Sequence, residues 1–325
     1  MNINIYILSS YYKKIKFNLF GKTKKGQRRT IRLFGIKINY KKKIKKFKDD
    51  DKLQKRISEF NQTGVTTEKR KPQLIISVTS FSQRIRDVHF TLYSLLTQTL
   101  KPDAVVLWLG EEEFPDKENN LPQSVLALKR NGLTIKWCKD TGSYKKLIPS
   151  LKEYPDDIIV TADDDIYYRP NWLELLYNAY LKEPQYIHCH RAHRITFDKN
   201  ENITEYSKWS KEVSKVEPSF CNFLTGGGGA LFPPKSLYKD ALDEELFLKL
   251  SPTADDLWFW AMAVLNNTKI NVIKNNISKL FYTNAEREFG LNDEKTLAQK
   301  NIIGGGNDKQ IKNILNHYPA LKNIQ

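Results

Sequence analysis

Hydrophobic and polar positions change their pattern near residue 73. Beyond it, short apolar runs alternate with stretches in which apolar side chains recur every three or four residues. Apolar runs of four to eight residues predict buried strands, and the longer spacing predicts helices. We expect strands at 74–80, 104–109, 133–138, 157–162 and 185–192, and helices at 85–98, 121–132, 145–154 and 171–182.

The alternation of strands with helices of about ten residues is typical of an α/β fold. It predicts a Rossmann-like, mostly parallel sheet flanked by helices. In such sheets, ligands bind beyond the carboxyl ends of the strands. The residues directly after each predicted strand are therefore the first candidates for a functional site.

Residues 1–70 have a different composition. They hold 21 Lys or Arg and 5 Asp or Glu, which accounts for the whole net charge of +16, because the rest of the chain carries 32 of each. Cations alternate there with Ile, Leu, Phe and Tyr, which favours binding to an anionic membrane surface. A solvated basic arm and a nucleic-acid-binding arm are the alternatives. Because the remainder is neutral, we expect no nucleic-acid partner.

This contrast predicts the domain organisation. We expect a basic, membrane-surface-associating extension over 1–70 and a catalytic domain over 71–325. Within the latter we expect a nucleotide half over 71–200 and an acceptor half with a C-terminal lid over 201–325. The three cysteines are widely spaced and no run of ~20 apolar residues occurs. We therefore expect a cytoplasmic protein, peripheral on the inner face of the membrane.

Three adjacent carboxylates, Asp163, Asp164 and Asp165, directly follow the predicted strand at 157–162. Adjacent carboxylates repel one another and stay ionised most easily beside a cation. Mg²⁺ and Mn²⁺ prefer oxygen ligands and often combine one or two carboxylates with substrate phosphates. We predict a Mn²⁺ or Mg²⁺ site at Asp165 and Asp163, with Asp163 and Asp164 also contacting the donor. The alternative is an acidic turn that caps the next helix.

Several segments together resemble a known class of enzymes. VTSFSQR, LTQTLKPDAVVLWL, SYKKLIPSLKEYPDDIIVTADDDIYYRPNWLELLY, HCHRAHRI, GGGGALFPP and DDLWFWAMAV resemble, in this order, bacterial glycosyltransferases of lipopolysaccharide and capsule assembly, over roughly residues 73–290. These are similar to the large inverting family with a GT-A fold. The resemblance implies a hexosyltransferase that moves a sugar from a nucleotide donor, with UDP-sugar expected, to a glycan or lipid-linked glycan acceptor.

The resemblance also implies a catalytic base. An acidic pair stands in the corresponding place of these families, which puts the base at Asp256, with Asp255 where Glu is usual. An inverting transfer needs a base because the acceptor hydroxyl loses its proton as it attacks. The alternative is that both residues only favour the start of a helix.

Further candidates lie near the predicted strand ends. Thr79, Ser80 and Arg84 follow the first strand and are expected to meet the nucleotide, with Arg84 facing the diphosphate. Tyr144 is expected to stack on the base, and Lys145 and Lys146 to reach a phosphate. The alternatives are ordinary surface or helix positions.

On the acceptor side, four glycines permit close approach of a sugar to the main chain. The residues predicted to line the acceptor or sugar loop are Gly226, Gly227, Gly228, Gly229, His190 and Trp258. His188, Cys189, His190 and His193 also suggest zinc, but no second ligand cluster accompanies them.

Three other functions remain open. A retaining glycosyltransferase would not need Asp256 as a base. A nucleotidyltransferase would also use a parallel sheet and a carboxylate-bound metal, although VTSFSQR lacks the expected Gly-rich signature. A non-enzymatic protein would use the basic arm alone for membrane or nucleic-acid binding.

Overall fold

The computed structural model describes residues 2–4, 16–18, 20–25, 28–33, 36–41, 50–214, 216–284, 301 and 304–324. The chain divides into two compact units, one of residues 1–50 and 284–296, the other of residues 51–283 and 297–325. Residues 51–70, which the charge pattern grouped with the extension, thus belong to the larger unit.

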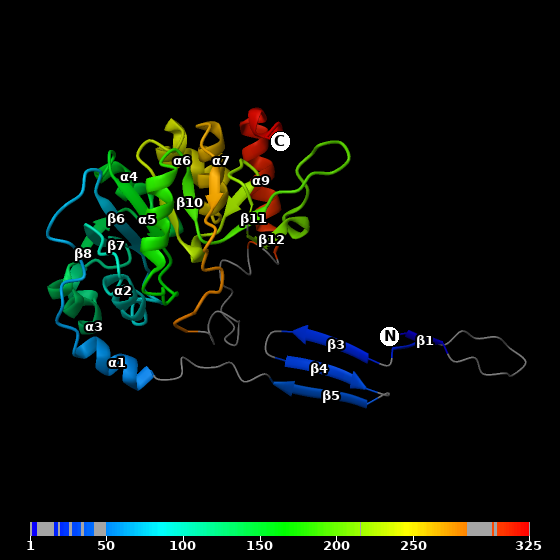
Figure 1. The fold of residues 1–325 in the computed structure, drawn as a ribbon, viewed down its shortest axis with the longest axis horizontal. Coiled ribbons are helices and arrows are strands. Elements are labelled where there is room, and N and C mark those ends of the chain that lie inside the picture. Colours follow the sequence, from blue (N-terminus) through cyan, green and yellow to red (C-terminus); the bar gives the residue numbers. More distant parts are fainter. Residues whose placement is uncertain are drawn as a thin grey trace, which may run out of the picture. The chain divides into compact units, whose positions relative to one another are not determined.

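The larger unit is built on a seven-stranded sheet whose strand order is β15-β10-β14-β9-β6-β7-β8. Helices flank this sheet (Figure 1). Its strands are β6 (Leu74–Thr79), β7 (Ala104–Gly110), β8 (Leu133–Cys138), β9 (Ile158–Ala162), β10 (Ile187–Cys189), β14 (Ala230–Phe232) and β15 (Ile270–Val272). The predicted fold class, a mixed α/β fold with a mostly parallel sheet, is confirmed.

One strand of this sheet runs against the others. β14 pairs antiparallel with both β9 and β10, whereas β6 pairs parallel with β7 and β9, β7 with β8, and β10 with β15. The sequence pattern did not predict β14, because three residues after a glycine run are too short to show a period. Its insertion brings that glycine run beside the carboxyl end of β9.

The helices of the larger unit are mostly short. They are α1 (Asp50–Ser58, which begins at the unit boundary), α2 (Val88–Leu96), α3 (Gln123–Leu126), α4 (Ile148–Glu153), α5 (Trp172–Lys182), α6 (Glu244–Leu250), α7 (Asp255–Leu265) and α9 (Gly306–His317). The helix predicted at 121–132 is instead α3 followed by a 3₁₀ turn at Ala127–Asn131, which ends at Gly132 with φ of 103°. No helix among the described residues is long and apolar enough to cross a bilayer.

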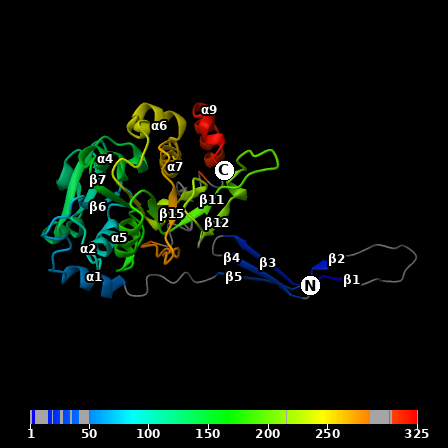
Figure 2. The same ribbon diagram turned by 45° about the horizontal axis from the view of Figure 1, so that its top comes forward.

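The C-terminal segment packs against the body of this unit. α7 and α9 lie side by side in both views (Figures 1 and 2), and Ile311, Ile314 and Leu321 are buried in the core. Burying such a side chain contributes about 1.5–3 kcal/mol. Residues 304–324 are therefore a packed part of the unit, and the predicted lid role of this tail stays a prediction.

A second, three-stranded sheet in the larger unit has the order β12-β11-β13. It consists of β11 (Ala192–Arg194), β12 (Ser210–Val213) and β13 (Asn222–Leu224), all antiparallel, and its register shifts at β11. It directly follows β10 and directly precedes the glycine run. It thus lies in the sequence between two parts of the candidate site.

The smaller unit contains β1 (Asn2–Asn4), which pairs with β2 (Lys16–Asn18), and an antiparallel meander of β3 (Phe20–Lys25), β4 (Arg28–Leu33) and β5 (Ile36–Lys41). The basic segment therefore includes ordered sheet pairings, which its charge pattern alone did not predict.

Candidate functional site

The Asp triplet begins directly after β9, at the edge of the sheet where β6, β7 and β8 also end. The backbone N–H of Asp163 donates to the Tyr168 hydroxyl at 2.8 Å, which fixes the turn. The Asp163 side chain is 31% exposed, whereas those of Asp164 and Asp165 are each 9% exposed. Asp163 is therefore the member of the triplet most open to a ligand.

Arg84, from the loop after β6, neutralises the other two carboxylates. Its guanidinium donates to Asp164 Oδ1 at 3.0 Å and to Asp165 Oδ2 at 2.5 Å. Ser80 Oγ donates to Asp164 Oδ2 at 2.6 Å. Asp164 thus ties the β6 loop to the triplet, a positioning contact that leaves little of its carboxylate for a donor. Thr79, which donates to the Trp108 carbonyl at 2.8 Å, lies beside this loop.

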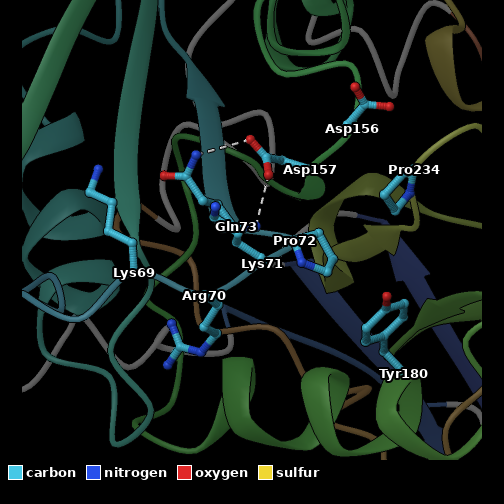
Figure 3. A pocket seen from close by; sticks show the side chains of 9 residues that line it. All are labelled: Lys69, Arg70, Lys71, Pro72, Gln73, Asp156, Asp157, Tyr180 and Pro234. Carbon is cyan, nitrogen blue, oxygen red and sulfur yellow. Dashed lines mark hydrogen bonds between the residues drawn. The ribbon is translucent and has the colours of Figure 1, made fainter.

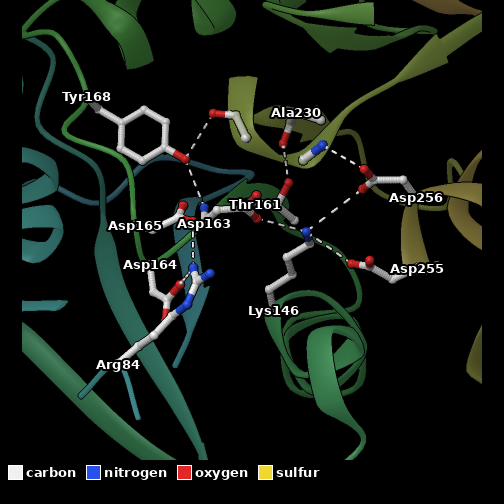
Figure 4. Close-up of polar contacts among 12 residues, drawn as sticks. Arg84, Lys146, Thr161, Asp163, Asp164, Asp165, Tyr168, Ala230, Asp255 and Asp256 are labelled. Carbon is white, nitrogen blue, oxygen red and sulfur yellow. Dashed lines mark hydrogen bonds and ion pairs between the residues drawn. The ribbon is translucent and has the colours of Figure 1, made fainter. Parts of the chain in front are cut away.

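Lys146 joins the triplet to the second acidic pair (Figure 4). Its Nζ lies 2.9 Å from Asp163 Oδ1, 3.0 Å from Asp255 Oδ2 and 3.8 Å from Asp256 Oδ1. Burial acts to lower the pKa of this ammonium, but attraction by the three carboxylates outweighs it and raises the pKa well above the ordinary value. Lys146 is therefore a permanent cation between the two acidic segments.

Asp255 and Asp256 occupy the first turn of α7. This helix begins without a side-chain cap, and the two carboxylates contact Lys146 instead, while Asp256 Oδ2 also accepts the Gly226 N–H at 2.9 Å. Their first-turn position agrees with the alternative that they favour the start of the helix, and the ion pairs with Lys146 are contacts beyond that role. Both residues turn toward the carboxyl edge of the sheet, as a role in the site requires.

The environment of Asp256 suits a proton acceptor. Burial is the largest cause that raises the pKa of its carboxyl, to about 7, and the negative charges of Asp255 and Asp163 add to it, while Lys146 and the Gly226 N–H oppose it. Its Oδ1 is inaccessible to solvent, although 27% of the side chain is exposed. A general base is most effective when its pKa lies near the working pH.

The glycine run lies directly against the acidic residues and Lys146. It forms a 3₁₀ turn at Gly226–Gly228, and a Cβ at Gly226 would lie 2.5 Å from Lys146 Nζ and 3.1 Å from the nearest oxygens of both Asp163 and Asp256. Gly229 has φ of 82°, and a Cβ there would lie 2.4 Å from the Trp172 ring. Only glycine lets the main chain approach these side chains so closely.

Four predicted site residues lie away from this cluster. The Tyr144 ring is fully buried and stacks on Phe247 at 4.1 Å, and its hydroxyl donates to the Ser251 carbonyl at 2.6 Å. It packs the core and does not face a nucleobase. Lys145 is buried and pairs with Asp140 at the ends of β7 and β8. Lys145 and its sequence neighbour Lys146 therefore form ion pairs with different carboxylates.

His190 and Trp258 are also core residues. Nε2 of His190 donates to the Trp172 carbonyl at 2.9 Å, and its Nδ1 accepts the Ile277 N–H at 3.0 Å. Trp258 is fully buried, with Nε1 donating to the Ala241 carbonyl at 3.2 Å. Since the polar ring atoms of both residues are satisfied inside the protein, neither presents one to an acceptor sugar.

Two contacts of the site were not anticipated. Tyr168 holds the triplet turn, and Thr225 links the glycine run to Arg191, whose guanidinium donates to Thr225 Oγ1 at 2.8 Å. The position of Tyr168 five residues after Asp163 was a usable signal, because a short turn brings it back toward the strand end. Nothing in the local pattern distinguished Arg191 from other surface cations.

The charges of the site fit a divalent metal ion. Five carboxylates, those of Asp163, Asp164, Asp165, Asp255 and Asp256, gather here, and in the described part of the chain Arg84 and Lys146 form ion pairs with them. A diphosphate would be repelled there without a further cation. In the described part of the chain no three His, Cys, Asp or Glu side chains surround one metal position. An ion would therefore complete its shell with substrate oxygens, as Mg²⁺ often does.

A cavity of about 700 Å³ lies at the amino ends of the strands, away from the acidic cluster (Figure 3). It is lined by residues that precede β6 and β9, including Arg70, Gln73 and Asp157, and by Tyr180 of α5. The backbone N–H of Gln73 donates to Asp157 Oδ1 at 2.8 Å, and its side-chain Nε2 donates to Asp157 Oδ2 at 3.1 Å. These groups satisfy one another at the amino ends of the strands, and none of the predicted site residues lines this cavity.

No family model matches the chain, and no curated protein matches it. Among solved structures, it is similar to CMP:2-keto-3-deoxy-manno-octonic acid synthetase complexed with CTP, at 10% identity over 64% of this chain and 90% of that chain, with a TM-score of 0.36. It is also similar to the inositol-1-phosphate CTP transferase from T. maritima, at 13% identity over 68% of this chain and 95% of that chain, with a TM-score of 0.39.

The first of these is by its name a synthetase complexed with CTP, and the second a CTP transferase. Likeness at this level of identity and TM-score concerns the fold and carries no argument about activity. The family implied by the sequence resemblance has no counterpart among these findings.

Proposed function

We propose that the protein is a metal-dependent inverting glycosyltransferase that moves a sugar from a nucleotide donor, UDP-sugar, to a glycan acceptor. The observation that carries the proposal is the placement of Asp256. Its carboxyl, whose pKa burial raises to about 7, lies across Lys146 from the half-buried Asp163 of the triplet. An acidic donor side and a separate proton acceptor are the two parts that a single displacement at an anomeric carbon requires.

In the proposed reaction, the acceptor hydroxyl oxygen attacks the anomeric carbon while the bond from that carbon to the diphosphate oxygen breaks. Asp256 accepts the hydroxyl proton, and the nucleoside diphosphate leaves with the bonding electrons. Asp165 and Asp163 would hold Mn²⁺ or Mg²⁺, which would neutralise charge on the leaving diphosphate. Arg84 and Lys146 keep the carboxylates in place through their ion pairs. Gly226 holds Asp256 by its N–H.

The proposal extends to the acceptor and the cellular site. The excess of cations in residues 1–70 supports attraction to an anionic membrane surface, each cation contributing roughly 1 kcal/mol near it. An enzyme held there on the cytoplasmic face could act on a lipid-linked glycan of lipopolysaccharide or capsule. Binding of the full chain to vesicles with and without anionic lipid tests this part separately from catalysis.

Product analysis separates the proposal from its alternatives. The protein is incubated with UDP-sugars and simple glycosides, and in parallel with CTP or UTP and free or phosphorylated sugars. Release of UDP together with a glycoside of inverted configuration supports the proposal. Release of pyrophosphate would identify a nucleotidyltransferase instead, and a product of retained configuration would remove the base role of Asp256.

The pH dependence of transfer follows from the environment of Asp256. Because the base must be deprotonated and its pKa is raised to about 7, kcat/KM is expected to rise with pH through about 7 and then level off. Steady-state rates between pH 5.5 and 8.5, with metal and donor saturating, measure this. A rate that is flat from pH 5.5, or that falls through 7, contradicts the assignment of the base.

A further inference from the structure

Two cations, Arg191 and Lys211, lie next to Glu212, the first through an ion pair and the second in sequence. Arg191, between β10 and β11, donates from its guanidinium to Thr225 Oγ1 and to Glu212 Oε1, each at 2.8 Å. Thr225 precedes Gly226, whose N–H binds Asp256. Arg191 is therefore anchored one residue from the contact that holds the proposed base. Its side chain is 19% exposed, and a guanidinium has five N–H donors, so further donors are available to a ligand.

Lys211 of β12 is the second cation. It is exposed, and its Nζ donates to the Tyr206 carbonyl at 2.5 Å and lies 3.4 Å from the centroid of the Tyr206 ring. Within the described ranges no ion pair joins it to a carboxylate. Partial burial lowers its pKa to about 8, with the charge of Arg191 contributing and Asp308 opposing. A bound anion would relieve the repulsion between these two cations.

The backbone around Lys211 is held in an unusual conformation. Glu212 has φ of 52°, the left-handed region that side chains other than glycine rarely adopt, and its N–H donates to His193 Nδ1 at 3.0 Å. This arrangement sets the Glu212 carboxylate on Arg191 and displaces β12 from regular pairing with β11. Such conformations persist where surrounding contacts hold them, and they cluster at binding sites.

We propose that Arg191 and Lys211 form a subsite that binds an anionic group, a phosphate or a carboxylate, on the acceptor glycan. This inference rests on the proposed function. The three carboxylates around Lys146 would repel an anionic acceptor. Arg191, which Thr225 links to the glycine run that binds Asp256, would offset part of that repulsion together with Lys211. A neutral acceptor would gain nothing from the charge of Lys211, which no ion pair among the described residues neutralises.

The test uses the full chain with UDP and Mn²⁺ present, so that the donor side is filled. Glucose 6-phosphate, glucuronate and glucose are each titrated by calorimetry, at low and at high salt. We expect at least one anionic sugar to bind at least tenfold more tightly than glucose, with the preference reduced by salt. Lys211→Gln is expected to weaken that binding at least fivefold. The matched control is Lys208→Gln, since Lys208 is exposed and pairs with Glu205 at 3.5 Å.

The two anionic arms distinguish a phosphorylated from an acidic acceptor. Equal binding of all three sugars, no binding of any, displacement of UDP by the anionic sugar, or unchanged binding in Lys211→Gln would each overturn the subsite. UDP binding in the same samples reports on the proposed function independently. Its presence without a preference for anions would leave the transferase proposal standing and remove only this inference.

Discussion

Replacement of Asp256 by Asn is expected to lower kcat for sugar transfer by roughly 10²- to 10⁴-fold. The amide is the same size and can still accept the Gly226 N–H, but it cannot take a proton from the acceptor. UDP-sugar binding is expected to remain within about threefold, since the lost interaction acts mainly in the transition state. Initial rates and calorimetric donor binding on the same preparation measure the two effects.

Two comparisons make this result specific. Asp243→Asn, which alters a residue that caps α6 by accepting the Leu246 N–H at 3.0 Å, is expected to keep normal kcat. Asp255→Asn is expected to cost less than Asp256→Asn, because Asp255 contacts Lys146 but is not held by the glycine run. A larger loss in Asp255→Asn would transfer the base role to Asp255, and normal transfer by Asp256→Asn would refute it for Asp256.

The second large effect concerns stability. Lys146→Met removes the cation shared by Asp163, Asp255 and Asp256, and is expected to lower the free energy of unfolding by about 3–5 kcal/mol at pH 8. Lys146 lowers the pKa of the Asp256 carboxyl, which burial raises, so without Lys146 that pKa rises further above its value in the unfolded chain. The folded state then binds protons more readily, so the loss should be smaller at pH 5.5 than at pH 8. Denaturant unfolding at both pH values measures this.

An exposed ion pair is the matched control. Lys235 pairs with Asp156 at 3.1 Å, with side chains 81% and 77% exposed. Lys235→Met is therefore expected to change the free energy of unfolding by less than about 0.5 kcal/mol. A similar small change in Lys146→Met, independent of pH, would mean that the carboxylates around Lys146 are not coupled as described.

Much of the fold was accessible from the apolar pattern. β6 at 74–79 and β9 at 158–162 agree with the predicted strands to within a residue, because each is an apolar run buried on both faces. β8 at 133–138 also agrees, although it is an edge strand whose side chains are mostly half-buried. β14 was missed because three residues carry no period, and its antiparallel direction depends on pairing with β9 and β10, which are distant in sequence.

Some of the predicted site residues lie together in the structure, whereas others are packed in the core. Asp163 follows a strand and Asp256 begins a helix, and both meet at the carboxyl edge of the sheet. Their positions in the chain, next to predicted elements, were enough to suggest this. Residue type and position did not show which way a side chain turns. Tyr144, His190 and Trp258 therefore seemed accessible, whereas the structure packs all three in the core with their polar atoms bonded.

The most direct test of the central claim is a calorimetric titration of the full chain with UDP, with Mn²⁺ and with EDTA, repeated for Asp165→Ala. The proposal predicts UDP binding that requires Mn²⁺ and is lost in the variant, because Asp165 and Asp163 would hold the ion that offsets the negative charge of the site. Failure of UDP and of GDP, dTDP and CMP to bind with metal present would contradict it. UDP binding that is equal in EDTA and in Asp165→Ala would contradict the metal site.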